Sequence, residues 1–96
     1  MLLLPATLTS REARDTLRLL SQALQREPGN EAEIHAGGLQ QFDTAALAVL
    51  LECQRLAQAW GKRFALRHAP PKLVALATLY GVDVLLLRSD QATAPV

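Results

Sequence analysis

Residues 31–71 read EAEIHAGGLQQFDTAALAVLLECQRLAQAWGKRFALRHAPP, and the changes of pattern along this stretch predict the fold class. Residues 31–36 alternate polar side chains with Ala, Ile and Ala, which predicts a half-buried strand ending at Gly37-Gly38. Residues 44–60 are rich in alanine and leucine and predict a helix, and residues 64–68 alternate again as a strand. Two strands joined by a helix predict a parallel pair, because parallel neighbours need a crossover connection.

The helix over residues 44–60 has the clearest boundaries in the chain. Asp43 directly precedes it and is a residue type that accepts hydrogen bonds from the free N–H groups of a first helical turn. Gly61 follows Trp60 and fits the position after a helix at which a left-handed conformation is common.

Toward the N-terminus, the sequence predicts a second helix and a short opening strand. Thr9 and Glu12 have the spacing of a capping box, in which each side chain satisfies a free backbone N–H group of the other residue. The apolar residues that follow lie on one face, and we expect a helix over Ser10–Glu27 that Pro28-Gly29-Asn30 ends. Leu2–Leu4 is expected to form the opening strand.

Toward the C-terminus, Pro70-Pro71 opens a third expected helix, which Gly81 ends. Val82–Leu87 is a continuous apolar run that is short enough for a buried strand. The expected order is therefore βαβαβαβ, in one α/β domain with a mostly parallel four-stranded sheet and about three helices. The domain should cover residues 1–88, followed by a mobile tail at 89–96.

The composition excludes several classes of function. Half of the 96 residues are hydrophobic, and a formal net charge of +1 provides little attraction for a phosphate backbone, so we expect no nucleic-acid partner. The single cysteine, Cys53, cannot form an internal disulfide, which favours a reducing compartment. Neither a signal peptide nor a segment of membrane-spanning length is recognisable, so we expect a cytoplasmic protein without direct membrane insertion.

The residues that could carry chemistry do not form a recognisable catalytic motif. Gly37-Gly38 lacks the continuation of a P-loop or of a dinucleotide fingerprint, and a tight loop explains the pair. His35 and His68 lack ligand neighbours at metal-site spacing, and we expect both as partly exposed residues on strands. Cys53 fits a small buried thiol. We therefore expect no enzyme activity, no metal and no cofactor.

The stretch Phe42-Asp43-Thr44-Ala45-Ala46-Leu47 is the candidate functional site. Local stability is one explanation, because Asp43 can cap the helix and Thr44 can occupy its first turn. In the alternative explanation, the small side chains leave the start of the helix accessible to a protein partner. Phosphate on Thr44 would fit the positive end of the helix dipole while adding negative charge to the docking surface, and it would act as a switch.

The same stretch, continued by Ala48-Val49-Leu50-Leu51, resembles the signature of STAS domains, which occur in anti-sigma factor antagonists and sulphate transporters. Their motif is Asp-Ser or Asp-Thr followed by small residues and leucines. The resemblance extends over nearly the whole chain and includes the run from Pro71 to Val82. Residues 76–80, Leu-Ala-Thr-Leu-Tyr, are most similar to the MlaB-like branch, whose members are small cytoplasmic subunits on the ATPase of the Mla phospholipid ABC transporter.

The resemblance implies a partner surface around Asp43, Thr44, Ala45, Ala46 and Leu47. In the MlaB-like branch the partner is an ABC transporter ATPase, and the residue at the position of Thr44 is a threonine used in contact. In the anti-sigma branch the partner is an anti-sigma factor kinase, and the position of Thr44 is the phosphorylation site, usually a serine. Both alternatives remain open.

Two departures from the family pattern are visible in the sequence. STAS domains usually begin with an additional strand, whereas this chain starts almost at the second one. A C-terminal helix is also common in the family, and Ser89–Val96 is too short to predict one. An exposed sheet edge at Leu2–Leu4 could then pair with another molecule, which includes a homodimer among the expected partners.

Overall fold

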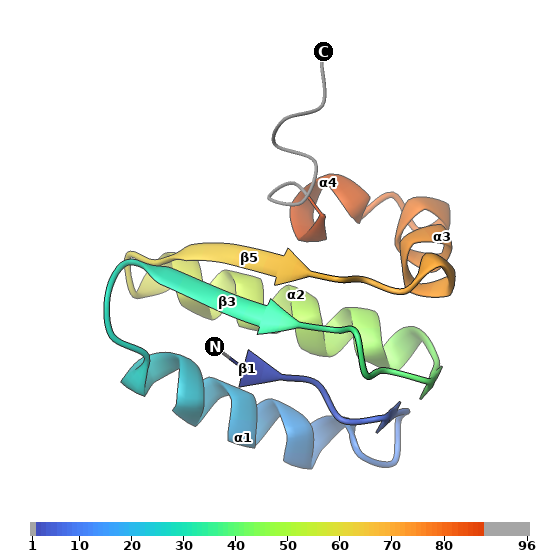
Figure 1. Ribbon diagram of the computed structural model, residues 1–96, viewed down its shortest axis with the longest axis horizontal. Helices are drawn as coiled ribbons and strands as arrows, with labels where there is room; N and C mark the ends of the chain where they lie inside the picture. The colour runs from blue at the N-terminus through green and yellow to red at the C-terminus, as the bar shows by residue number, and fades with distance from the viewer. Residues whose placement is uncertain (1, 88–96) are drawn as a thin grey trace.

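The computed structural model describes residues 2–87, and its elements alternate mainly between strands and helices (Figure 1). In chain order they are β1 (Leu2–Leu3), β2 (Thr7–Leu8), α1 (Ala13–Arg26), β3 (Glu31–His35), β4 (Gln41–Phe42), α2 (Thr44–Ala59), β5 (Arg63–Arg67), α3 (Pro71–Leu79) and α4 (Asp83–Leu86). The mixed α/β class is therefore confirmed. The mobile tail expected at 89–96 lies outside the described residues.

The main sheet is parallel and has the strand order β1-β3-β5. Leu2 is in register with Ile34, and Ile34 with Leu66, so one row of apolar side chains crosses all three strands. Helix α2 connects β3 to β5 as the predicted crossover. The pairing leaves β1 at an edge of this sheet, as we expected for Leu2–Leu4.

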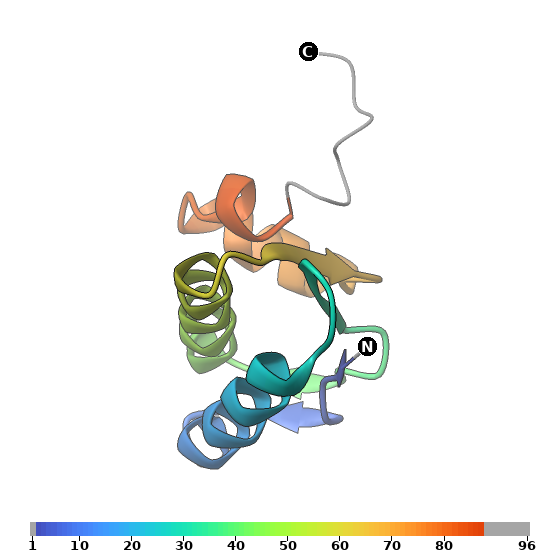
Figure 2. The ribbon, with the colours of Figure 1, turned by 90° about the vertical axis from the view of Figure 1, so that its left-hand side faces the viewer.

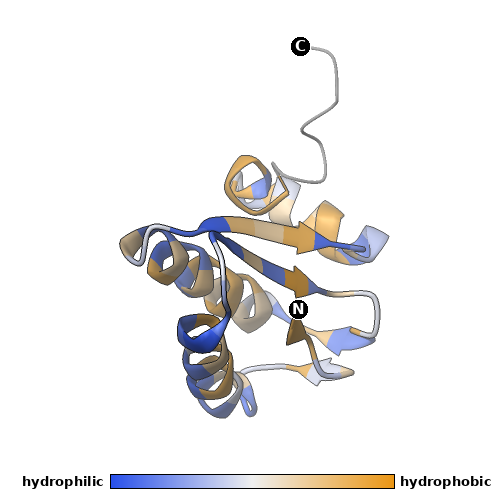
Figure 3. Ribbon diagram, turned by 60° about the vertical axis from the view of Figure 1, so that its left-hand side comes forward, coloured by the Kyte–Doolittle hydropathy of each residue, from blue (hydrophilic) through white to orange (hydrophobic). Residues whose placement is uncertain are grey.

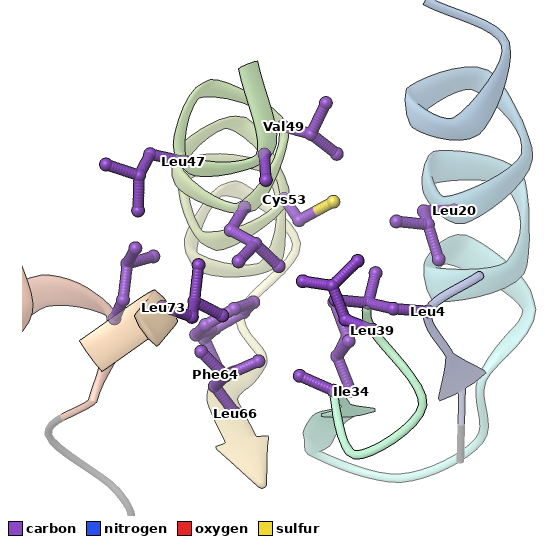
Figure 4. Close-up of a cluster of buried hydrophobic side chains, with 14 of the residues drawn as sticks. Leu4, Leu20, Ile34, Leu39, Leu47, Val49, Cys53, Phe64, Leu66 and Leu73 are labelled. Carbon is purple, nitrogen blue, oxygen red and sulfur yellow. The ribbon is translucent and has the colours of Figure 1, made fainter. Parts of the chain in front are cut away.

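Helices α1 and α2 cover one face of the main sheet, and α3 and α4 lie beyond β5 (Figures 1 and 2). The core lies between the sheet and the two long helices (Figure 4). Its fully buried large side chains come from every layer: Leu8, Leu24, Ile34, Leu50, Leu66, Leu73, Leu86 and Leu87. No helix within residues 2–87 is both long and apolar enough to cross a membrane.

Helix α2 follows its sequence pattern closely. Leu50, Cys53 and Ala57 are each fully buried, and their spacing of three and four residues places them on the face that packs against the sheet. Gly61 has a φ of +73°, a conformation that glycine adopts without the steric penalty of a Cβ atom. The predicted helix and its end at Gly61 are confirmed.

The strand expected at Val82–Leu87 is wrong, because residues 83–86 form the short helix α4. Leu86 and Leu87 are buried, whereas Val84 and Leu85 are 66% and 50% exposed. Two exposed neighbours followed by two buried neighbours fit the period of a helix, whereas burial in a strand alternates from one residue to the next. Every side chain of residues 82–87 except Asp83 is apolar, so the sequence pattern does not distinguish a helix from a strand here.

A second sheet of two strands was not expected from the sequence. β2 and β4 pair in parallel, with Thr7 in register with Gln41 and Leu8 with Phe42. The main sheet therefore has three strands instead of four, and the small sheet holds the segments that precede α1 and α2 side by side.

The start of α1 differs from the predicted boundary by three residues, because residues 10–12 form a turn and the helix begins at Ala13. Glu12 accepts hydrogen bonds from the backbone N–H of Thr9 at 2.8 Å and from its hydroxyl at 2.7 Å. The hydroxyl of Thr9 accepts a bond from the N–H of Arg11 at 3.3 Å. The predicted pairing of Thr9 with Glu12 is present in this modified form.

Lys62 connects the end of α1 to the loop before β5. Its ammonium group donates to the carbonyl of Leu24 at 2.7 Å and to the carbonyl of Glu27, which belong to the last turn and the C-terminal cap of α1. A cation at a helix C-terminus satisfies free carbonyl groups and opposes the negative end of the helix dipole.

Replacing Lys62 by methionine should therefore lower the free energy of unfolding by about 2 kcal/mol, because methionine keeps most of the volume and loses both charged hydrogen bonds. Urea denaturation measures this difference. Lys72→Met is the matched control, since Lys72 is exposed on α3, and the control should stay within about 0.5 kcal/mol of the wild type. Equal losses in the two variants would contradict a specific role for Lys62.

Candidate functional site

The candidate site lies at the N-terminus of α2, where Asp43 is the N-cap residue. A carboxylate oxygen of Asp43 accepts a hydrogen bond from the backbone N–H of Ala45 at 2.8 Å, which satisfies one free donor of the first turn. The predicted cap is confirmed. Thr44 is the first residue of the helix and is exposed, and its hydroxyl has no hydrogen-bond partner within residues 2–87.

The other carboxylate oxygen of Asp43 connects α2 to the segment before α1. It accepts a hydrogen bond from the backbone N–H of Ser10 at 3.3 Å, between residues 33 positions apart in the chain. The pairing of β2 with β4 makes this contact geometrically available, because the two strands lead directly into the two helix starts. One carboxylate thus holds the starts of α1 and α2 together.

Glu12 strengthens the same corner of the molecule. The hydroxyl and then the backbone N–H of Thr9 donate hydrogen bonds to its carboxylate, and these bonds lower the pKa of Glu12 below its ordinary value. Glu12 consequently remains charged and paired at neutral pH. The carboxylates of Asp43 and Glu12 thus both accept hydrogen bonds from backbone N–H or hydroxyl groups at this corner.

The structure divides the five predicted site residues into a surface group and a core group. Asp43 and Thr44 are exposed and Ala45 is half-buried, whereas Ala46 and Leu47 are 0% and 4% exposed. Leu47 points from α2 toward the side of α3, and Val49 points toward α1 (Figure 4). The side chains of Ala46 and Leu47 therefore lie in the core and do not form the surface that we expected of them.

Two further residues, Ala48 and Ser10, lie next to the exposed residues of the candidate site and were not singled out from the sequence. Ala48 is exposed and lies one turn after Thr44, so the i, i+4 spacing of a helix could have identified it. Ser10 lies beside Asp43 only because β2 and β4 pair, and no local pattern indicates that contact. We use the term α2 docking surface for Asp43, Thr44, Ala45 and Ala48.

The rings of the two histidines lie close together, His35 at the end of β3 and His68 directly after β5. Their ring centroids are 5.2 Å apart, and Nε2 of His35 lies 3.1 Å from a carboxylate oxygen of Glu33. Arg67 donates to the other oxygen of Glu33 at 3.2 Å. The hydrogen bond with His35, followed by that from Arg67, lowers the pKa of Glu33.

Glu33, His35 and Arg67 form a local hydrogen-bonded network. His35 ends β3, and His68 is exposed one residue beyond β5 with a φ of +58°, so only His35 lies on a strand as expected. No group of three metal-ligating side chains occurs in the part of the chain that the structure describes. Cys53 is buried in α2, and burial raises the pKa of its thiol to about 12, which keeps it protonated and unreactive at neutral pH.

Comparison with known protein families assigns the chain to a family. A family model described as "Mlab, STAS domain" matches residues 1–88, which is almost the whole sequence. The chain belongs to the STAS family. A search of curated proteins found no match. STAS domains are generally non-catalytic and typically mediate protein–protein interactions, and both properties agree with a site built from a helix cap, a free hydroxyl and small side chains.

Proposed function

We propose that this STAS domain is a non-catalytic subunit that binds the cytoplasmic ATPase of an ABC-type phospholipid (Mla) transporter and stabilises or regulates it. The match of residues 1–88 to the MlaB-type STAS model is the observation that carries this proposal. The protein would act in the cytoplasm and would be held at the inner membrane through its partner.

The geometry of the α2 docking surface supports a contact role for Thr44. The hydroxyl is exposed and forms no hydrogen bond with any of the described residues 2–87, and the flanking Ala45 and Ala48 carry only a methyl group. A partner backbone can therefore approach the first turn closely. Ala46 and Leu47 anchor the same turn in the core, which fixes the position of the surface residues. A hydroxyl on a rigid helix can then donate or accept one hydrogen bond without a large loss of conformational entropy.

The test is binding to the purified ATPase of the phospholipid transporter from the same organism, measured by isothermal titration calorimetry. Thr44→Glu should weaken binding at least about 100-fold, because the carboxylate adds bulk and an unpaired charge at the contact. The variant should remain folded, since an acidic residue at the first position of a helix interacts favourably with the helix dipole. A thermal melt checks that point.

Gln58→Glu is the matched control for this test. Gln58 is exposed on the same helix, about 21 Å along its axis from Thr44, and the substitution adds the same charge. Its affinity should stay within about twofold of the wild type. Absence of binding by the wild-type protein would refute the proposed function, whereas equal affinities of the wild type and Thr44→Glu would remove Thr44 from the interface.

The exposed hydroxyl of Thr44 also supports a second candidate function, that of an anti-sigma factor antagonist. Because Asp43 already caps the helix, the Thr44 hydroxyl is available to a kinase. In this alternative the domain binds a kinase-type anti-sigma factor while Thr44 is free and releases it when Thr44 is phosphorylated. Detection of phosphate on Thr44 by mass spectrometry of protein from native cells, with recovery of such a kinase, would favour this function.

A further inference from the structure

An exposed apolar patch covers the end of α3 and the outer side of α4. It consists of Leu79, Tyr80, Val84 and Leu85, which are 77%, 58%, 66% and 50% exposed. Figure 3 shows α4 largely in the colour of hydrophobic residues. We call these four residues the α3–α4 patch.

The α3–α4 patch cannot turn inward, because the opposite sides of both helices already face the core. Leu73 and Ala77 anchor α3, and Leu86 and Leu87 anchor the end of α4. Gly81, with a φ of +72°, makes the tight connection between the two helices. The exposure of the patch therefore follows from the packing of the fold.

The size of the patch indicates a binding surface of limited extent. The exposed fractions correspond to roughly 450 Å² if a large apolar side chain has about 150–220 Å² of surface. The largest apolar patch on a monomer is typically about 300–600 Å² and is often functional. A stable protein interface needs about 800 Å² from each partner, so the patch alone is too small for a stable dimer of this chain.

Charge and sequence argue against two other occupants. Residues 88–96 read RSDQATAPV and contain no large apolar side chain other than Val96, so they offer little to bury against the patch. A lipid surface would be favoured by a cationic rim, but the charged residues within α3 and α4 are Lys72 and Asp83, whose charges cancel.

We propose that the α3–α4 patch receives an uncharged, apolar helix or ridge of the same protein partner that contacts the α2 docking surface. Helix α4 packs against both α2 and α3. Because α4 contacts α2 directly, one partner can reach both surfaces. The α2 docking surface, with two polar residues and two alanines, offers no large apolar side chain, and the patch supplies that apolar area. Charge-poor apolar residues are typical of the centre of an interface.

This inference rests on the proposed function, and binding of the purified transporter ATPase tests it. Leu79→Ser and Val84→Ser should each weaken binding at least about tenfold, and their combination about 100-fold. Leu19→Ser is the matched control for Leu79→Ser, because Leu19 is 66% exposed on α1 and the same side chain is replaced. The control affinity should stay within about twofold of the wild type, and circular dichroism should show that all variants are folded.

The outcomes separate the inference from the proposed function. Loss of binding in the patch variants with normal binding by Leu19→Ser supports the inference. Loss of binding in Thr44→Glu with wild-type affinity in the double patch variant overturns the inference and leaves the proposed function intact. No binding by the wild type refutes both. Concentration-dependent self-association in sedimentation velocity that the patch variants abolish, with unchanged ATPase affinity, would assign the patch to a second copy and would also overturn the inference.

Discussion

Replacing Leu50 by alanine is expected to lower the free energy of unfolding by about 3 kcal/mol. Leu50 is fully buried on the face of α2 that packs against the main sheet. The substitution removes three carbon atoms from the core and leaves a cavity, and buried Leu→Ala changes cost about 2–5 kcal/mol. Because a domain of this size has about 5–15 kcal/mol of stability, the loss is a large fraction of the total.

Urea denaturation followed by circular dichroism measures this prediction. Leu19→Ala makes the same chemical change at a site that is 66% exposed on α1, and its stability should stay within about 0.5 kcal/mol of the wild type. A loss below about 1 kcal/mol for Leu50→Ala would show that the centre of α2 is not packed as the structure indicates.

Stability is also expected to fall at alkaline pH because of the buried thiol of Cys53. Burial, followed by the nearby charge of Glu52, raises the pKa of Cys53 to about 12 in the folded state. In the unfolded chain a cysteine has a pKa of about 8.5. Below the unfolded pKa both states are protonated and the thiol has no effect on the pH dependence.

Between the two pKa values only the unfolded state loses the proton, so deprotonation favours unfolding. The contribution of Cys53 should reduce the free energy of unfolding by roughly 3 kcal/mol at about pH 10.5. Cys53→Ala is the control, because it removes the thiol and leaves every other ionisable side chain in place. Denaturant titrations at pH 7.5 and 10.5 should show a smaller decrease in this variant, and equal decreases would contradict the raised pKa.

The candidate site was predictable from the sequence where its contacts are local. Asp43 caps α2 through a bond to a residue two positions later, and such a contact depends only on residue type and on the start of the helix. The exposure of Thr44 and Ala48 follows the helical period. The sequence did not reveal the burial of Ala46 and Leu47, because small or apolar residues of α2 occur on both its core side and its exposed side.

The order of the long elements follows from the amino-acid sequence. Alternating residues define β3, a capping residue and a terminal glycine delimit α2, and two prolines open α3. Each of these signals acts over a few residues, so it is present in the chain before any long-range contact forms.

Only the tertiary structure decided the features that depend on contacts between distant segments. Residues 82–87 form a helix whose side chains are divided between the core and the surface, and a run that is apolar except for Asp83 does not encode that division. The pairing of β2 with β4 and the bond from Ser10 to Asp43 join segments more than 30 residues apart. Such contacts form only when the whole chain has folded, because no short segment contains both partners.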